Sequence, residues 1–263
     1  MDLLTHTLSG IAVGTVIAGF SSQRLKEKSN ILLFSGLGGA FPDIDAISLW
    51  PGFDKTFGKF FGLSHAGKDI YVSKYWYSHH GFFHSLLASI LFALIIGFLL
   101  RIFQKKTTFI NSLKDHSLIL TGFIAGFILH LLEDMPTPIG AWGGVRLFWP
   151  LKIYIGGWGN IWWWNNYDIF LMVVGVIALN LLILGLKRKI KTDISKLTIV
   201  VLLLAVVLCV FQIRTRGFNF NPDGKKNLYE RYEVKSKEIQ RRTLGKTTFK
   251  IMEKFDGLVP LNF

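Results

Sequence analysis

Three histidines lie within six residues in the segment YSHHGFFHSLL, immediately before a long apolar run. His80 and His84 are four residues apart, and so are His130 and Asp134 in the segment HLLEDMPTP. Residues four apart share one face of an α-helix, so each pair is expected to present two side chains together. Imidazole and carboxylate groups bind zinc, manganese and iron. The two pairs therefore predict a metal site between helices, a place where helical bundles build such sites.

Three more residues of ligand type are expected at the same level of the molecule: His6 near the start of the chain, and the two aspartates of FPDID. The predicted ligand set is therefore His6, Asp43, Asp45, His80, His84, His130 and Asp134. Seven ligands exceed the four of one tetrahedral site, so one to three divalent ions are expected. Zn²⁺ is the first choice, with Mn²⁺ or Fe²⁺ as alternatives. His79 ranks below His80 as a ligand, and His116 is expected on the opposite side of the membrane, where it serves as a negative control.

Four residues are expected to assist a reaction at this site. Asp45 or Glu133 could orient a water molecule, although Glu133 points about 100° away from the His130–Asp134 pair on an ideal helix. Two ions about 3.5–4 Å apart would hold the attacking and leaving oxygens of a phosphate ester. Arg146 or Lys152 could then bind the phosphate charge, or could serve as a plain interfacial anchor.

Long apolar helices must position these residues. Half of the 263 residues are hydrophobic and the mean hydropathy is +0.40, which is too apolar for an ordinary soluble domain. Several runs approach the roughly 20 residues that span a bilayer. We therefore predict an all-α polytopic membrane bundle in residues 1–213, followed by a small basic tail in residues 214–263. The six expected spans are Leu3–Phe20, Ile31–Ile47, Phe82–Phe103, Ser117–Leu132, Asp168–Leu186 and Leu197–Ile213.

The basic residues predict the orientation of the bundle. The short linkers 21–30, 101–116 and 187–196 carry twelve Lys and Arg, whereas the longer loops 48–81 and 133–167 carry six. The positive-inside rule places the three linkers in the cytoplasm, and the N-terminus and metal site at the outer face. All eight tryptophans fall in the two outer loops, as expected for a belt at headgroup depth. The tail would also lie outside, and its alternating pattern fits either a β-hairpin or a short helix.

Four segments carry a resemblance to a known family. THTLSG, FPDID, HHGFFHSLL and HLLEDMPTPIG…LFWPL, in this order among apolar spans, resemble the bacterial membrane-bound metal-dependent hydrolases. Members of that family are often labelled LexA-binding, inner-membrane-associated hydrolases. The family is distantly similar to zinc-dependent phospholipase C and to single-strand-specific zinc nucleases, which are helical and use His/Asp clusters. The resemblance covers about residues 1–155 and implies that the same seven residues form the site. Gly81 stands where the family often has arginine, so a phosphate-binding role at that place is open.

The leading functional expectation is a metal-dependent phosphoesterase of the plasma membrane. Its substrate would be a lipid phosphate or phosphodiester at the outer leaflet, since a site at headgroup depth meets lipid headgroups directly. The first alternative is a non-enzymatic membrane protein with a structural metal, or a metal transporter. The second is a nuclease or nucleic-acid-binding protein that uses the basic tail, although membrane topology and anionic lipid are commoner reasons for a net charge of +13. The pattern leaves the oligomeric state open.

Overall fold

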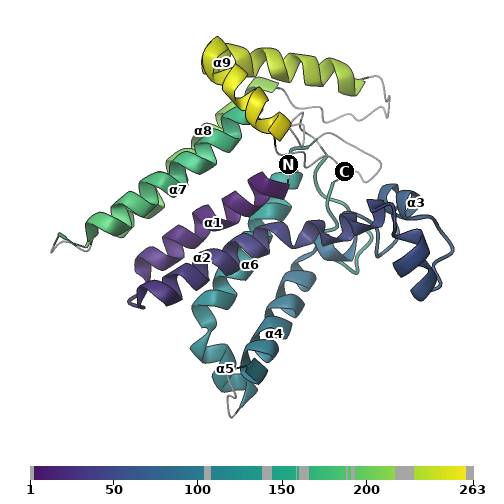
Figure 1. Ribbon diagram of the computed structural model, residues 1–263, viewed down its shortest axis with the longest axis horizontal. Helices are drawn as coiled ribbons and strands as arrows, with labels where there is room; N and C mark the ends of the chain where they lie inside the picture. The colour runs from purple at the N-terminus through teal and green to yellow at the C-terminus, as the bar shows by residue number, and fades with distance from the viewer. Residues whose placement is uncertain are drawn as a thin grey trace.

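The computed structural model describes residues 3–103, 108–137, 144–157, 159, 166–187, 189–190, 193–216 and 228–258. These residues are nearly all helical, and five of the helices are long and apolar enough to cross a membrane. The elements in chain order are α1 (Leu3–Phe20), α2 (Leu25–Ala40), η1 (Pro42–Leu49), η2 (Asp54–Gly58), α3 (Gly67–Val72), η3 (Phe82–His84), α4 (Leu86–Phe103), α5 (Phe109–Asp115), α6 (Ser117–Asp134), α7 (Tyr167–Lys187), α8 (Lys196–Arg216) and α9 (Leu228–Leu258). The all-α polytopic bundle is confirmed (Figure 1).

The second predicted span is a bent pair of helices. The α-helix α2 ends at Ala40, and the 3₁₀ helix η1 begins at Pro42 with a change of direction of 48°. Proline has no backbone N–H and fixes φ, so it starts a helix readily but does not continue one. The two pieces together raise the number of candidate spans to six. The break places Asp43 and Asp45 in the first turn of η1.

Glycines bring three helices into direct backbone contact at the centre of the molecule. Gly10 of α1 and Gly126 of α6 both pack against the carbonyl oxygen of Ser35 in α2, and Gly38 of α2 packs against the carbonyl of Phe123. A Cβ at any of these glycines would collide with those backbone atoms. Small residues let membrane helices approach closely, and Gly10–Gly14 and Gly122–Gly126 each have the four-residue spacing of that packing. The tight triplet of α1, α2 and α6 is the frame on which the site is built.

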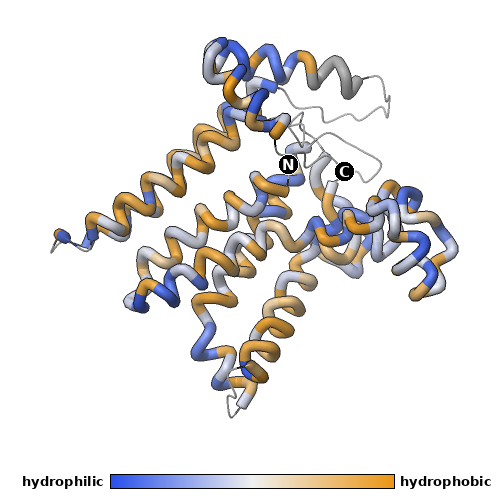
Figure 2. Tube along the Cα trace, in the orientation of Figure 1, coloured by the Kyte–Doolittle hydropathy of each residue, from blue (hydrophilic) through white to orange (hydrophobic). Residues whose placement is uncertain are grey.

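The remaining spans face outward. Only 22% of the spanning window of α4, 22% of that of α7 and 6% of that of α8 is buried. Figure 2 shows hydrophobic colour along these helices, with hydrophilic residues gathered toward their ends. Such a surface would be unstable in water but suits contact with lipid acyl chains.

The tail is helical rather than a β-hairpin. The helix α9 is bent at Gly245, where φ is 74°, and packs on the first turn of α7 and the last turn of α8. A buried ion pair holds this corner, because Arg216 donates to both oxygens of Asp168 at 2.6 and 2.9 Å. Ser236 of α9 accepts a further hydrogen bond from Arg216 at 3.0 Å. The described part of the tail, residues 228–258, is therefore joined to the bundle by polar contacts.

Candidate metal centre

Five histidines gather at one end of the α1–α2–α6 frame, and each has its Nδ1 atom in a hydrogen bond. The acceptors are Glu133 for His6 (2.7 Å), Asp45 for His79 (2.7 Å) and for His84 (3.1 Å), the Gly144 carbonyl for His80 (2.8 Å), and the Gly39 carbonyl for His130 (2.6 Å). An acceptor at Nδ1 requires the proton on that nitrogen. In the neutral ring the lone pair is then on Nε2, which is the atom that can bind a cation.

The Nε2 atoms converge on the carboxylate of Asp134. His6 Nε2 lies 3.2 Å from Oδ1 of Asp134, and His130, His84 and His80 lie 3.1, 3.5 and 3.7 Å from Oδ2. The Nε2 atoms of His84 and His130 are 3.3 Å apart. His6 Nε2 is buried and, among the described residues, its contact with Asp134 lacks hydrogen-bond geometry. A buried polar atom without a hydrogen bond is costly, so this convergence fits a bound cation.

Asp43 completes the ring of acceptors. Its Oδ1 lies 3.6 Å from His130 Nε2 and 3.8 Å from His84 Nε2. Three overlapping groups offer ligand atoms within 4.8 Å of one another: His79, His80 and His84; His6, His130 and Asp134; and Asp43, His84 and His130. Imidazole and carboxylate together suit zinc, manganese or iron, and three groups provide more ligands than one ion uses. The described residues therefore fit at least one divalent ion.

The two i,i+4 pairs differ in structure. His130 and Asp134 share a face of α6, as predicted. The helical interpretation of His80 and His84 is wrong, because His80 lies in a turn with φ of 61°, His84 ends the 3₁₀ helix η3, and α4 begins only at Leu86. The turn is tight at Gly81, where a Cβ would collide with the carbonyl oxygens of Trp76 and Ser78. The two imidazoles still lie close, with ring centroids 4.5 Å apart.

Asp45 and Glu133 are placed to orient histidines. The two oxygens of Asp45 accept hydrogen bonds from His79 and His84, and its side chain is almost fully buried. The sequence predicts Asp45 as a metal ligand; in the structure each of its oxygens is close to the Nδ1 atom of a histidine, and a ligand role stays a prediction. Glu133 plays the same part for His6 and keeps a partly exposed side chain. Such carboxylate–histidine pairs fix the tautomer and orientation of metal ligands.

Three residues of the site have roles that the sequence concealed. His79 lies within ligand distance of His80 and His84, although we had ranked it below His80. The only signal for it was its place in a double histidine. The carbonyl groups of Gly39 and Gly144 hold two of the rings, and backbone acceptors have no signature in sequence.

The two residues predicted to bind phosphate are Arg146 and Lys152. Among the described contacts, neither side chain contacts the histidine cluster. Arg146 is buried and donates from Nε to the Leu151 carbonyl and from Nη2 to the Pro150 carbonyl, both at 2.8 Å. Its backbone N–H also donates to the His80 carbonyl at 3.2 Å. Lys152 is exposed. Arg146 therefore braces the loop that carries Gly144, and a phosphate contact from it remains a prediction.

Burial and charge set the protonation of the histidines beside α4. Burial lowers the pKa of the His80 imidazole well below its usual value, and the neighbouring His79 and His84 lower it further. At His84 burial acts in the same direction, but Asp45, Asp134 and Asp43 outweigh it and raise the pKa of the ring well above its usual value. Tyr71, which stacks on His79, also has a raised pKa because it is buried near the site carboxylates.

The control residues and the tryptophans fall where their positions in the sequence suggest, as far as the structure describes them. His116 starts α6 and contacts the Ser112 carbonyl through Nδ1 at 2.8 Å, about 21 Å along the helix from His130. Trp50 is 50% exposed and Trp76 is 58% exposed. Trp149 belongs to the described loop, whereas Trp142, Trp158, Trp162, Trp163 and Trp164 lie outside the described residues.

Comparisons with known proteins identify a family. The model of a family described as YdjM inner membrane protein matches residues 1–216, which include the bundle and the whole histidine cluster. The segment with α9 lies beyond the match. No curated protein and no solved structure matches the chain.

Proposed function

The chain belongs to the YdjM inner membrane protein family, and we propose that this multi-pass inner membrane protein is a metal-dependent hydrolase. The observation that carries the proposal is the shared arrangement of five histidines, each held at Nδ1, four of which have Nε2 within 3.7 Å of Asp134. The two oxygens of Asp134 face four of these nitrogens at 3.1–3.7 Å, and a shared cation would satisfy all of these groups together. These residues would hold a divalent ion, and such an ion would supply Lewis acidity for a phosphoryl oxygen and a nucleophilic water near neutral pH.

The residues around the ligands have separate tasks in this proposal. The residues that would hold the ion or ions are His6, His79, His80, His84, His130, Asp43 and Asp134. Asp45 keeps two rings in the ligating tautomer. Glu133 is the candidate general base, because only its Oε2 is engaged by His6 and its side chain is 14% exposed. A base must reach both the ligand sphere and the substrate, and Glu133 lies at the edge of the cluster.

A lipid phosphate or phosphodiester at the outer leaflet is the proposed substrate. The site lies where α1 begins and α6 ends, and both helices are candidate membrane spans, so a headgroup could reach it while the acyl chains stay in the membrane. The basic linkers at the other ends of the helices support an outer location by the positive-inside rule. Single cysteines at Lys26 and at Lys68, in a Cys209→Ala background, test this orientation by labelling intact cells. Labelling at Lys68 alone is expected, and labelling at Lys26 alone would reverse the topology.

Hydrolysis tests the function directly. Purified protein in lipid nanodiscs should release phosphate or a phosphorylated headgroup from one class within a panel of phospholipids, lysolipids and polyprenyl phosphates. Chelator should abolish the release, and Zn²⁺ or Mn²⁺ should restore it. His116→Ala provides a matched control for His84→Ala. If metal stays bound and the panel shows no metal-dependent turnover, the enzyme proposal fails.

A structural metal site is the second candidate. The side chains of His84 and His130 have no exposed surface, which is a property of closed structural sites. Against it, the side chains of Asp43 and Glu133 are 15% and 14% exposed, so the cluster opens on one side. Removing the metal would distinguish the two candidates. Loss of a structural ion would lower the stability of the fold without any effect on turnover, since there would be no turnover to lose. Loss of a catalytic ion would abolish the release of phosphate.

A further inference from the structure

The segment between η1 and His79 forms a lobe with exposed aromatic side chains. We call residues 50–78 the aromatic lobe; it contains η2 and α3. Its exposed rings are Trp50 (50% exposed), Phe57 (40%), Phe60 (81%), Phe61 (65%) and Trp76 (58%). Phe60 packs edge-on against Phe61 with centroids 4.9 Å apart, and Trp50 similarly meets Phe57 at 6.3 Å. Clusters of large apolar side chains on a surface mark a binding face rather than a solvated one.

Lysines surround these rings. Lys55 and Lys59 are exposed and lie four residues apart on the helical turn that carries Phe57 and Phe60. Lys68 and Lys74 are also exposed. Of the two carboxylates in the lobe, that of Asp54 accepts a hydrogen bond from the Gly67 backbone at 2.7 Å. Aromatic rings among basic side chains suit the surface of a leaflet that contains anionic lipid. There the rings can contact acyl chains while the lysines contact the anionic headgroups.

The lobe is tied firmly to the metal centre. Gly67 packs against the Ser48 carbonyl of η1 so closely that a Cβ there would collide with it. Tyr71 of α3 stacks on His79, with centroids 4.5 Å apart and the ring planes within 11°. His79 in turn donates to Asp45. Because of these contacts, the depth of the lobe in a membrane would also fix the depth of the histidine cluster.

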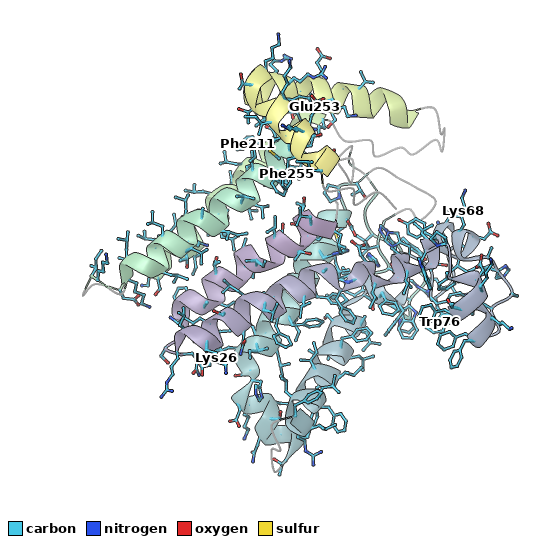
Figure 3. The ribbon with its side chains drawn as sticks, viewed as in Figure 1. Lys26, Lys68, Trp76, Phe211, Glu253 and Phe255 are labelled. Atoms are coloured by element: carbon cyan, nitrogen blue, oxygen red, sulfur yellow. The ribbon has the colours of Figure 1, made fainter. Side chains whose placement is uncertain are left out.

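The lobe extends sideways from the site end of the bundle. Figure 1 shows α3 and its neighbouring turns beyond the start of α4, away from α7 and α8. In Figure 3, Lys68 and Trp76 stand on opposite edges of the lobe, and Trp76 is on the edge toward which α4 descends. A spanning helix runs into the bilayer, so the edge with Trp76 is the one that would face the membrane.

We propose that the aromatic lobe is an interfacial anchor that inserts its exposed rings into the outer leaflet, with Lys55 and Lys59 on anionic phospholipid headgroups. The anchor holds the histidine cluster at the level of lipid phosphates. This deepens the proposed function, since it rests on an outer location of the site and explains how a lipid headgroup meets the cluster. Trp and Phe rings favour this depth, and lysine side chains reach from it to the headgroups.

Depth measurement on the full chain tests the anchor without any turnover. A fluorophore sensitive to polarity is attached at Phe60→Cys or, as control, at Lys68→Cys, both in a Cys209→Ala background. The protein is placed in nanodiscs of phosphatidylcholine with phosphatidylglycerol. Emission at position 60 should shift to the blue and be quenched several-fold more than at position 68 by lipids with a spin label in the upper acyl chain. Equal weak quenching at both positions would overturn the proposal, and the exposed rings would then fit a binding face for a protein partner instead.

Charge and activity provide independent checks. The double substitution Lys55→Glu and Lys59→Glu should reduce quenching at position 60 in nanodiscs with phosphatidylglycerol but not in phosphatidylcholine alone. Equal behaviour in the two lipids would contradict the role of anionic headgroups. If the hydrolase proposal also holds, Phe60→Ser with Phe61→Ser should raise the KM for a bilayer substrate and leave that for a short-chain soluble analogue unchanged. If hydrolysis is absent while quenching is strong, the function fails and the anchor stands.

Discussion

At the end of the bundle where α6 begins, polar side chains pair with neighbouring backbone and side-chain groups. His116 contacts the Ser112 carbonyl, and Lys187 donates to the Gly19 carbonyl at 3.0 Å and to Ser195. At the end where α6 finishes, the histidines are buried, and their hydrogen bonds engage one nitrogen and direct the other toward a shared centre. An ionisable residue in a membrane bundle is therefore not a site by itself. Convergence of several Nε2 atoms on one carboxylate is what separates the two ends.

Loss of Asp134 should have the largest effect. Its Oδ1 faces His6, and its Oδ2 faces His130, His84 and His80. Asp134→Ala therefore removes a carboxylate that lies next to four of the five histidines. We expect turnover to fall by several orders of magnitude and metal content to fall sharply. Asp115→Ala, at the end of α5 just before α6 begins, should leave both unchanged. Similar losses in the two variants, measured by phosphate release and elemental analysis, would erase the distinction between the ends.

Substitution of a residue that orients the rings should cost less than loss of a ligand. Asp45→Asn offers one good acceptor in place of two, so either His79 or His84 loses its anchor. The metal affinity should fall about 10–100-fold, the range seen when such supporting groups are removed. Titration of the apo protein with Zn²⁺ measures this, and Asp69→Asn on the exposed surface of the lobe serves as control. Complete loss of binding in Asp45→Asn would instead make Asp45 a ligand, as the sequence had suggested.

Metal binding should strengthen as the pH rises. The raised pKa of His84 means that this ring is protonated in the apo protein at neutral pH, and that charge favours the apo fold below the folded pKa and ceases to do so as the pH rises through it. A metal needs the neutral ring, so it must displace that proton. His80 has a depressed pKa and contributes no proton near pH 7. Calorimetry in two buffers of different ionisation enthalpy should show proton release on binding at pH 7; no release would contradict the assignment.

The smallest effect is expected at the basic end. Lys187 is 31% exposed and pairs with Asp193, which is 67% exposed and whose pKa is lowered to about 2 by Ser195 and by the lysine. Lys187→Ala should change the melting temperature slightly and leave the metal content as it was, because exposed pairs contribute little. Circular dichroism and elemental analysis check both points. A large loss of metal here would mean that the two ends are coupled.

The comparison also explains what the sequence could and could not predict. Hydropathy identified the spans because bilayer thickness constrains helix length, and the i,i+4 spacing placed His130 and Asp134 correctly. The same spacing misled at His80, since a positive φ and the tight turn at Gly81 depend on contacts with Trp76 and Ser78.

Other parts of the site were beyond a reading of side-chain types. The Gly39 carbonyl can hold His130 only because glycines let α1, α2 and α6 meet, and the four-residue glycine spacing on α1 and α6 was the available signal. The α-helical form of the tail likewise depends on its packing against Tyr167 and Arg216.

Elemental analysis tests the central claim most directly. The wild-type chain, purified without chelator, is compared with the double variant His84→Ala and His130→Ala and with His116→Ala. The account predicts a stoichiometric divalent metal in the wild type and in His116→Ala, and almost none in the double variant. A wild-type protein without metal after growth and purification in supplemented medium, or the same metal content in all three proteins, would contradict a metal centre at this end of the bundle.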